Sequence, residues 1–175
     1  MRSSVDERLA DVAVRPATAH DLDAIARIYA RYVTTSTATF EVEPPTTAEW
    51  RARLEAITAR GLPFLVAEVG GGVAGYAYCG PWRTRPAYRF TVENSVYVDA
   101  ELTGRGIGRA LMDELLRACR QAGIREVIAV VTDGHAGSLA LHRRSGFVEV
   151  GRLTRVGHKH GRWLDTLLLQ RSLGP

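Results

Sequence analysis

Three glycines at alternate positions, Gly104, Gly106 and Gly108, stand between a strand-like segment and a segment with helical periodicity. A loop of this kind exposes consecutive backbone N–H groups at the start of a helix, where the helix dipole also favours negative charge. A dinucleotide-binding GxGxxG motif is excluded because Arg109 stands where its third glycine is required, and no lysine is near enough for a P-loop. We therefore predict a phosphate-binding loop, with a flexible turn that caps the strand as the alternative.

The segment between Pro81 and Phe90, PWRTRPAYRF, combines arginines with aromatic side chains. The guanidinium group of arginine binds carboxylate and phosphate groups through two parallel hydrogen bonds. Aromatic side chains around such a guanidinium group exclude water. The segment therefore indicates a binding site for an anionic group, with an arginine-rich surface loop of ordinary aromatic packing as the alternative.

Two histidines, His158 and His160, flank Lys159 in a predicted turn. As a metal-binding pair they have no third ligand at a standard spacing, and the chain has no HExxH motif. We therefore predict no metal site, and a solvent-exposed hairpin turn in this segment.

The composition narrows the classes of protein that fit the chain. It has 175 residues, 46% of them hydrophobic and 24% charged, which suits one globular domain with a core. The net charge is +4, but the cations are scattered and Lys159 is the only lysine, so a nucleic-acid-binding tail is not indicated. Cys79 and Cys119 are too few for a disulfide framework, and we expect them in the core. No apolar run suits a signal peptide or a membrane helix, so we expect a cytoplasmic protein without nucleic-acid or membrane partners.

Periodicity and capping signals predict the elements that position these residues. Residues 18–21 and 46–49 read as capping boxes in front of two amphipathic helices. The helix after the glycine loop is predicted to bury Leu111, Leu115, Ala118 and Ala122, and a shorter helix is predicted within residues 133–147. Strands are predicted at residues 12–16, 64–69, 73–80, 91–98, 126–131, 147–153 and 163–170, the last two joined by residues 154–162.

The predicted order of elements is β-αα-βββ-α-β-α-ββ, without an internal repeat or linker. This order favours an α/β (α+β) fold with a single mixed sheet of about seven strands and helices on both faces. We expect one domain over residues 12–175, preceded by a flexible leader at residues 1–11.

Several motifs resemble one superfamily of acetyltransferases. The segment VYVDAELTGRGIGRAL, followed by a strand and the helix ALHRRSGF, resembles the GNAT superfamily of acetyl-CoA-dependent N-acetyltransferases. The segments TATFEVEPPTTAEW, VAGYAYCGPWR, TVENSVYV and GHKHGRW are similar to its phosphinothricin/methionine sulfoximine N-acetyltransferase group. The resemblance covers about residues 12 to 170. It implies the GNAT fold with a mostly antiparallel sheet, acetyl-CoA as cosubstrate, a small amino acid analogue as acceptor, and a homodimer.

The resemblance also implies a cofactor site. The backbone of Val96, Tyr97 and Val98 is expected to form hydrogen bonds with pantetheine, which lies beside it as an added strand would. The N–H of Val98 is expected to stabilise negative charge on the thioester oxygen. The diphosphate contacts are expected from Gly104, Arg105, Gly106, Ile107, Gly108 and Arg109, and further contacts from His135 and Ser138. Two positions depart from the family pattern, because Thr103 stands where the family has Arg or Gln and His135 where it has asparagine.

Two residues are expected to be catalytic from the same resemblance. An amine must lose a proton before it attacks a thioester directly in a ternary complex, and Glu93 aligns with the acid that serves as general base. Its place on the strand leads us to expect action through one or two waters. His142 stands where many members have a tyrosine that reprotonates the CoA thiolate. The alternatives are a surface glutamate paired with arginine, and a helix histidine bonded to a neighbour.

The resemblance implies an acceptor site that is shaped by the arginine-rich loop, by the region of Phe40 and Glu41, and by a partner subunit. Its expected residues are Phe40, Arg83, Thr84, Arg85, Tyr88, Arg89, Phe90, Glu93, Asn94, Ser95 and Lys159. An acceptor such as phosphinothricin carries a carboxylate and a second anionic or polar head, which arginine forks bind. Two further hypotheses are an acetyltransferase of another amine, such as a polyamine, an aminoglycoside or a protein N-terminus, and a non-catalytic acyl-CoA-binding module. The arginine loop disfavours a cationic acceptor, and Glu93 disfavours the non-catalytic module.

Overall fold

The computed structural model describes residues 12–174, so the leader expected at residues 1–11 lies outside it. Seven strands form one sheet in the order β1-β2-β3-β4-β5-β7-β6, and only the β4–β5 pair is parallel. The strands are β1 (Ala13–Pro16), β2 (Phe64–Val69), β3 (Gly72–Pro81), β4 (Thr91–Val98), β5 (Glu126–Thr132), β6 (Val148–Lys159) and β7 (Arg162–Ser172). The predicted mixed, mostly antiparallel sheet is confirmed.

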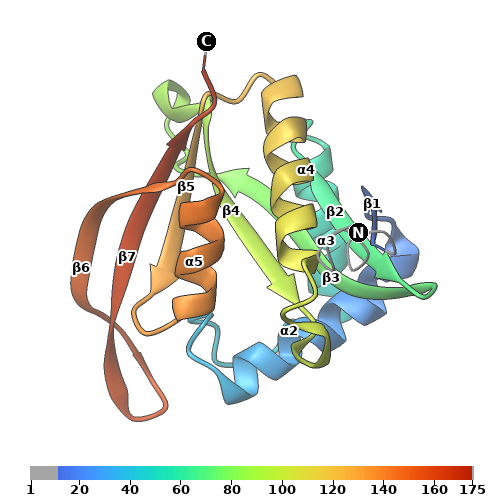
Figure 1. The fold of residues 1–175 in the computed structure, drawn as a ribbon, viewed down its shortest axis with the longest axis horizontal. Helices are drawn as coiled ribbons and strands as arrows, with labels where there is room; N and C mark the ends of the chain where they lie inside the picture. The colour runs from blue at the N-terminus through green and yellow to red at the C-terminus, as the bar shows by residue number, and fades with distance from the viewer. Residues whose placement is uncertain (1–11, 175) are drawn as a thin grey trace, which may run out of the picture.

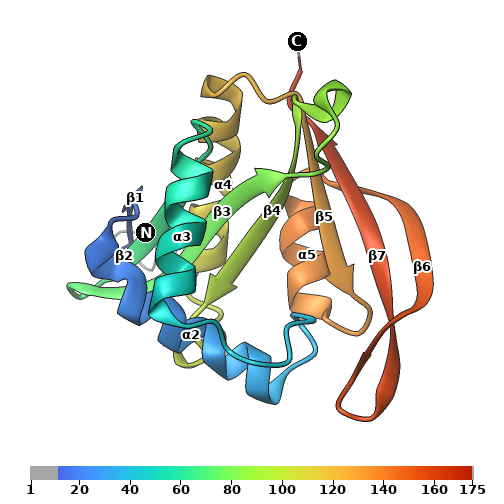
Figure 2. The same ribbon diagram turned by 180° about the vertical axis from the view of Figure 1, so that it is seen from behind.

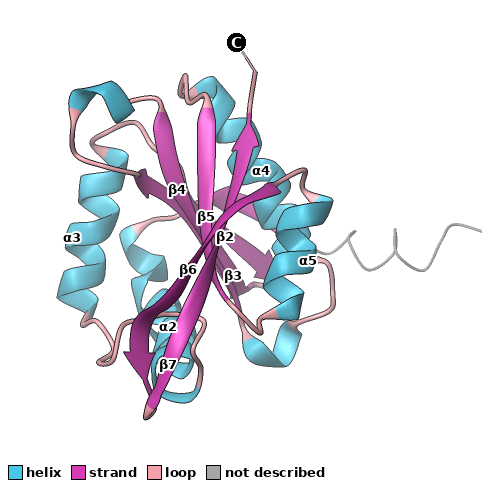
Figure 3. Cartoon of the chain, turned by 90° about the vertical axis from the view of Figure 1, so that its left-hand side faces the viewer, coloured by secondary structure: helices cyan, strands magenta, loops and turns pink. Residues whose placement is uncertain are grey.

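Four α-helices cover the sheet, two on each face. They are α2 (Leu22–Thr35), α3 (Thr47–Thr58), α4 (Ile107–Gln121) and α5 (Ala136–Arg144), and short 3-10 turns occupy Ala19–Asp21, Pro86–Tyr88 and Ala100–Leu102. Helices α4 and α5 lie on one face, and α2 and α3 on the other (Figures 1, 2 and 3). None of the helices in the described chain is long and apolar enough to span a bilayer.

Both predicted capping boxes are present, one at the 3-10 turn that leads into α2 and one at the start of α3. Before α3 the Thr46 hydroxyl accepts from the Glu49 N–H (3.2 Å), and the Glu49 carboxylate accepts from the Thr46 N–H (2.7 Å). Asp21 accepts the Thr18 N–H in the same way, and its carboxylate is also held by Arg15. These bonds satisfy N–H groups that have no partner within the helix.

The helices bury two clusters of apolar side chains, one on each face of the sheet. Helix α4 contributes Leu111 and Leu115, both fully buried, and Cys79 and Cys119 lie in the same cluster as free thiols, as expected for core positions. Ala122, however, is exposed, because α4 ends at Gln121. The opposite cluster is rich in aromatic rings from α2, α3, β2 and β3.

Strands β4 and β5 pair over only three residues and then separate. The paired residues are Thr91 with Glu126, Val92 with Val127, and Glu93 with Ile128. Figure 1 shows the two strands diverging beyond this point, with α5 in front of the opening. The rest of β4 keeps only β3 as a partner, and the rest of β5 only β7, so their facing edges have no strand partner in the described chain. Val130 of β5 is exposed and lines the cavity that opens between the two strands.

The β6–β7 hairpin differs from the prediction. Strand β6 continues to Lys159, and only His160 and Gly161, both with positive φ, connect it to β7. The prediction of a long connection at residues 154–162 is therefore wrong. A bulge between Leu153 and Gly157 interrupts the alternation of side chains along β6, which is why the sequence pattern resembled a loop.

Candidate active site

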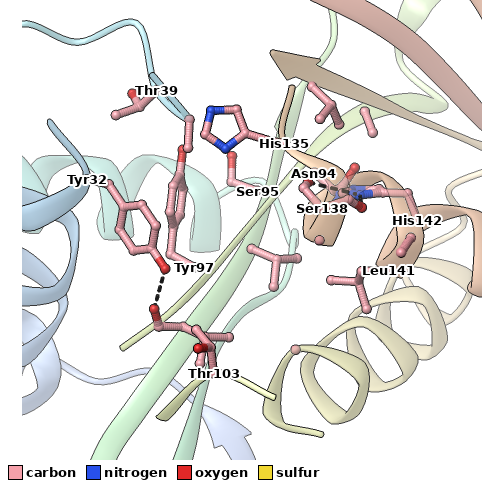
Figure 4. A pocket seen from close by; sticks show the side chains of 18 of the residues that line it. Tyr32, Thr39, Asn94, Ser95, Tyr97, Thr103, His135, Ser138, Leu141 and His142 are labelled. Carbon is pink, nitrogen blue, oxygen red and sulfur yellow. Dashed lines mark hydrogen bonds between the residues drawn. The ribbon is translucent and has the colours of Figure 1, made fainter. Parts of the chain in front are cut away.

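A single large cavity opens where β4 and β5 separate. Its volume is about 1360 Å³, above the usual range for a small-molecule pocket, and so large enough for an extended cofactor together with a second substrate. It is lined by β4, the glycine loop, β5, the first turns of α5 and the segment after α2. Figure 4 shows Tyr32 and Tyr97 on one wall and Asn94, Ser138 and His142 on the other.

The structure brings most of the predicted site residues to this cavity. Those that line it are Phe40, Glu93, Asn94, Ser95, Val96, Tyr97, Val98, Gly104, Arg105, Gly106, Ile107, Gly108, Arg109, His135, Ser138 and His142. Those that do not are Arg83, Thr84, Arg85, Tyr88, Arg89, Phe90 and Lys159.

The glycine loop gives one end of the cavity an affinity for anions. Gly106 is the N-cap of α4 with φ +84°, and no side chain caps the N–H groups of the first turn. Gly104 also has a positive φ (+77°), a backbone conformation that glycine adopts without strain. Arg105 and Arg109 are exposed beside the loop. The free N–H groups, the helix dipole and the two cations together suit a diphosphate.

The middle of the cavity presents the free edge of β4. Tyr32 donates its hydroxyl proton to the Val98 carbonyl (2.5 Å), and so fixes the end of the strand to α2. Tyr32 and Tyr97 also meet edge to face, with ring centroids 5.2 Å apart. An extended ligand can lie along such an edge as an added strand.

His142 is held in one protonation state by its neighbours. Its Nδ1 lies 2.8 Å from the Ser138 carbonyl, which can only accept, so Nδ1 carries the proton. Nε2 therefore accepts from the Asn94 side-chain amide (3.0 Å). Burial lowers the pKa of His142, which keeps the ring uncharged. This arrangement favours the alternative of a hydrogen-bonded helix histidine over a proton donor to a thiolate.

Glu93 lies at the point where β4 and β5 part. Its side chain is half-buried, and it has neither an ion pair nor a side-chain hydrogen bond within residues 12–174. Burial raises the pKa of its carboxyl, while the positive charge of Arg83 lowers it. A carboxylate whose pKa is raised toward the working pH is a better proton acceptor. The alternative, a surface glutamate paired with arginine, is not what the described chain shows.

The far end of the cavity is lined in part by two tyrosines that the sequence analysis did not select. Tyr29 from α2 and Tyr78 from β3 lie there with Thr39 and Glu41. Tyr29 and Thr39 share a hydrogen bond of 2.5 Å, and burial raises the pKa of Tyr29 to about 12. Neither tyrosine is among the predicted site residues, and their hydroxyl groups are the signal in the sequence that could have identified them.

The arginine-rich loop lies outside the cavity of its own chain. Its predicted site residues are all exposed, and Arg83 and Arg89 stack on the neighbouring rings of Trp82 and Phe90. The loop joins the end of β3 to the start of β4, whereas the cavity opens at the other end of β4 (Figure 1). The expectation that this loop lines the acceptor site is therefore wrong for a single chain.

Lys159 also differs from its prediction. It is buried near the end of β6, and its ammonium donates to the Thr39 carbonyl (2.8 Å), so it is neither in a solvated turn nor on the cavity wall. His158 packs on Trp163 at 5.0 Å between ring centroids. No group of three metal-ligating side chains occurs in the described part of the chain.

Comparisons with known proteins agree with this geometry. The family model described as acetyltransferase (GNAT) family matches residues 23–147. The phosphinothricin N-acetyltransferase of Alcaligenes faecalis is 48% identical over 161 residues, which cover 91% of this chain and 82% of that protein. The L-methionine sulfoximine/L-methionine sulfone acetyltransferase of Pseudomonas aeruginosa is 39% identical, with 93% and 95% covered. A crystal structure of a phosphinothricin acetyltransferase from Sinorhizobium meliloti in complex with acetyl-CoA is similar with a TM-score of 0.91 and 46% identity, covering 94% of this chain and 89% of that one.

Proposed function

The chain belongs to the acetyltransferase (GNAT) family, and we propose that it transfers the acetyl group of acetyl-CoA to the amino group of a small amino acid analogue, of the phosphinothricin or methionine sulfoximine type. One observation carries the proposal. A single cavity joins an anion-binding helix start, the free edge of β4 and a half-buried carboxylate. Curated relatives that act on such analogues support the choice of acceptor.

The residues at the glycine loop fit the diphosphate of acetyl-CoA. The N–H groups at the start of α4 have no side-chain cap, and Gly106 has no side chain that a bound diphosphate would have to displace. Acetyl-CoA, when bound, supplies the activated acetyl group. We assign its pantetheine arm to the edge of β4 at Val96–Val98, where the Val98 N–H stabilises negative charge on the thioester oxygen.

We assign Glu93 the role of general base. An α-amino group is mostly protonated at neutral pH and must lose a proton before it attacks. Glu93 is five residues from Val98, or roughly 17 Å along an extended strand. It therefore takes the proton through intervening water. His142 receives a positioning role in this proposal, because both of its ring nitrogens are already hydrogen-bonded.

We also propose a homodimer. The acceptor end of the cavity carries the carboxylates of Glu41 and Glu93, and the arginines that line the cavity are Arg105 and Arg109 at the glycine loop and Arg144 on α5. An amino acid acceptor has a carboxylate of its own, and a second subunit can supply a further cation for it from its arginine-rich loop. The outer strand β6 and the adjacent β7 expose the apolar side chains of Val148, Val150, Leu153, Val156 and Trp163, which suits a subunit interface.

A cytoplasmic location is part of the proposal. Cys79 and Cys119 are both free and buried, although their sulfur atoms are only 3.3 Å apart. Free thiols at this distance are consistent with a reducing compartment.

An assay of CoA thiol release tests the proposed activity. We expect release from acetyl-CoA with phosphinothricin, methionine sulfoximine or methionine sulfone, and none with spermidine or an aminoglycoside. Release with cationic amines alone would assign the chain a different acceptor, and no release with any amine would overturn the proposal.

Replacement of the base should slow the chemical step. We expect Glu93→Gln to lower kcat by about 100-fold or more while the Kd for acetyl-CoA stays unchanged. A base must be ionised to act, and burial raises the pKa of Glu93, so wild-type kcat/KM should fall as the pH drops through that raised pKa. In Glu93→Gln, kcat/KM should not show this fall at low pH. Glu101→Gln, at an exposed position, serves as control, and unchanged turnover in Glu93→Gln would remove the residue from this role.

A negative charge on the glycine loop should abolish cofactor binding. We expect Gly106→Glu to bind no measurable acetyl-CoA in calorimetry, because its carboxylate would repel the diphosphate. Gly123→Glu is the matched control: Gly123 has a similar positive φ (+78°) but lies just beyond the other end of α4, so both variants carry the same backbone strain. Retained affinity in Gly106→Glu would place the phosphates elsewhere.

Sedimentation analysis tests the dimer. We expect the wild-type chain to sediment as a dimer at micromolar concentration and Val150→Asp to sediment as a monomer, because a buried unpaired carboxylate disfavours an apolar interface. Val42→Asp, at another exposed apolar position that lies outside β6, should remain dimeric. A monomeric wild type would contradict the proposal, and dissociation by Val42→Asp alone would place the interface away from β6.

A further inference from the structure

Residues 36–46, which connect α2 to α3, form the wall at the acceptor end of the cavity. Ala38, Thr39, Phe40 and Glu41 all line the cavity. The segment has no helix or strand of its own, so hydrogen bonds to other elements must fix its position. In Figure 2 it runs from the end of α2 across the opening between β4 and β5.

Besides the pair of Glu41 with Arg53 of α3 (3.0 Å), three hydrogen bonds tie this segment to three other elements. The Thr37 hydroxyl is bonded to Nε2 of His135 at the start of α5 (2.9 Å). The Thr39 hydroxyl is bonded to Tyr29 of α2 (2.5 Å). The Thr39 carbonyl accepts from the ammonium of Lys159 on β6 (2.8 Å). The third bond spans 120 residues of sequence and is the one that joins the segment to the β6–β7 hairpin.

Lys159 is an unusual choice of residue for this place. It is the only lysine in the chain, and it is 4% exposed. Burial lowers its pKa, and the nearby charge of Glu41, which is itself paired with Arg53 (3.0 Å), opposes that effect. A buried ammonium is costly unless it is hydrogen-bonded. Lysine presents a compact point charge on a flexible stem, whereas the wider planar fork of arginine needs more room and more acceptors.

A second contact at the same place involves Phe40 and the backbone of β6. The Phe40 ring lies so close to Gly157 that a Cβ atom at this position would overlap it. The absence of a side chain at Gly157 therefore decides where the ring can lie. The end of β6 therefore holds residues 36–46 in two ways: Lys159 forms a hydrogen bond to Thr39, and Gly157 packs against the Phe40 ring.

We propose that Lys159 is a positioning residue for the acceptor substrate: it fixes the Thr39 carbonyl and thereby places Phe40 and Glu41, without touching the substrate itself. The proposal rests on the proposed function. It assigns acceptor recognition partly to a hairpin that does not line the cavity. Loss of the bond should affect the acceptor site and leave the acetyl-CoA site, at the other end of the cavity, intact.

Kinetics of three variants test the role. We expect Lys159→Met to raise the KM for the acceptor about tenfold or more, because small displacements of positioning groups have large effects, while the KM for acetyl-CoA changes less than twofold. Gly157→Ala should give the same pattern, because it displaces the Phe40 ring and leaves the lysine in place. His158→Ala, between the two and exposed, is the matched control and should behave as wild type.

Hydrogen exchange distinguishes a positioning role of Lys159 from direct contact between Lys159 and the substrate. It also gives a result that does not depend on the proposed function. Amides of residues 36–46 should exchange faster in Lys159→Met and Gly157→Ala than in wild type, with no change at residues 104–109. A raised acceptor KM in Lys159→Met without faster exchange, or no change in Gly157→Ala, would overturn the proposal in favour of direct contact between lysine and substrate. If Lys159→Met does not fold, Lys159→Gln, which is shorter and uncharged, takes its place in both measurements with the same expected results. If wild type acetylates no acceptor, the proposed function fails, and the exchange rates still decide whether Lys159 anchors the segment.

Discussion

The early separation of β4 from β5 is the constraint on which the rest of the structure depends. Two parallel strands that remained paired along their length would leave neither a free backbone edge nor space between them. Here pairing stops after Glu93 and Ile128. The remaining residues of β4 offer N–H and C=O groups to a ligand, and the cavity occupies the space that a continued ladder would have filled.

The cavity separates two kinds of charge along its length. The start of α4, with Arg105 and Arg109 beside it, makes one end attractive to anions, whereas Glu41 and Glu93 lie at the other end. An acyl carrier with a diphosphate and an amine acceptor therefore meet opposite ends of one site, with the free edge of β4 between them. The half-buried position of Glu93, where the strands part, raises its pKa and makes it suitable for accepting a proton.

The walls of this cavity are held by contacts between segments far apart in the sequence. The bond from Tyr32 to Val98 joins α2 to β4, and that from His142 to Asn94 joins α5 to β4. The bond from Lys159 to Thr39 joins β6 to the segment after α2. Each uses a polar side chain of an otherwise packed element, so the same residues stabilise the fold and shape the site.

Local patterns determined the order of elements, because capping boxes, alternation and glycine positions act over a few residues. The glycine loop was likewise visible in the sequence, because it lies on one strand–loop–helix unit, and Glu93 was identified from its alignment with the base of the family that the chain resembles. Only the tertiary structure decided that Tyr29 faces the cavity, that Lys159 is buried under Thr39 and that the arginine-rich loop points away from its own site. These outcomes depend on packing between distant segments and on a bulge that lengthens β6, and neither leaves a periodic signal in the chain.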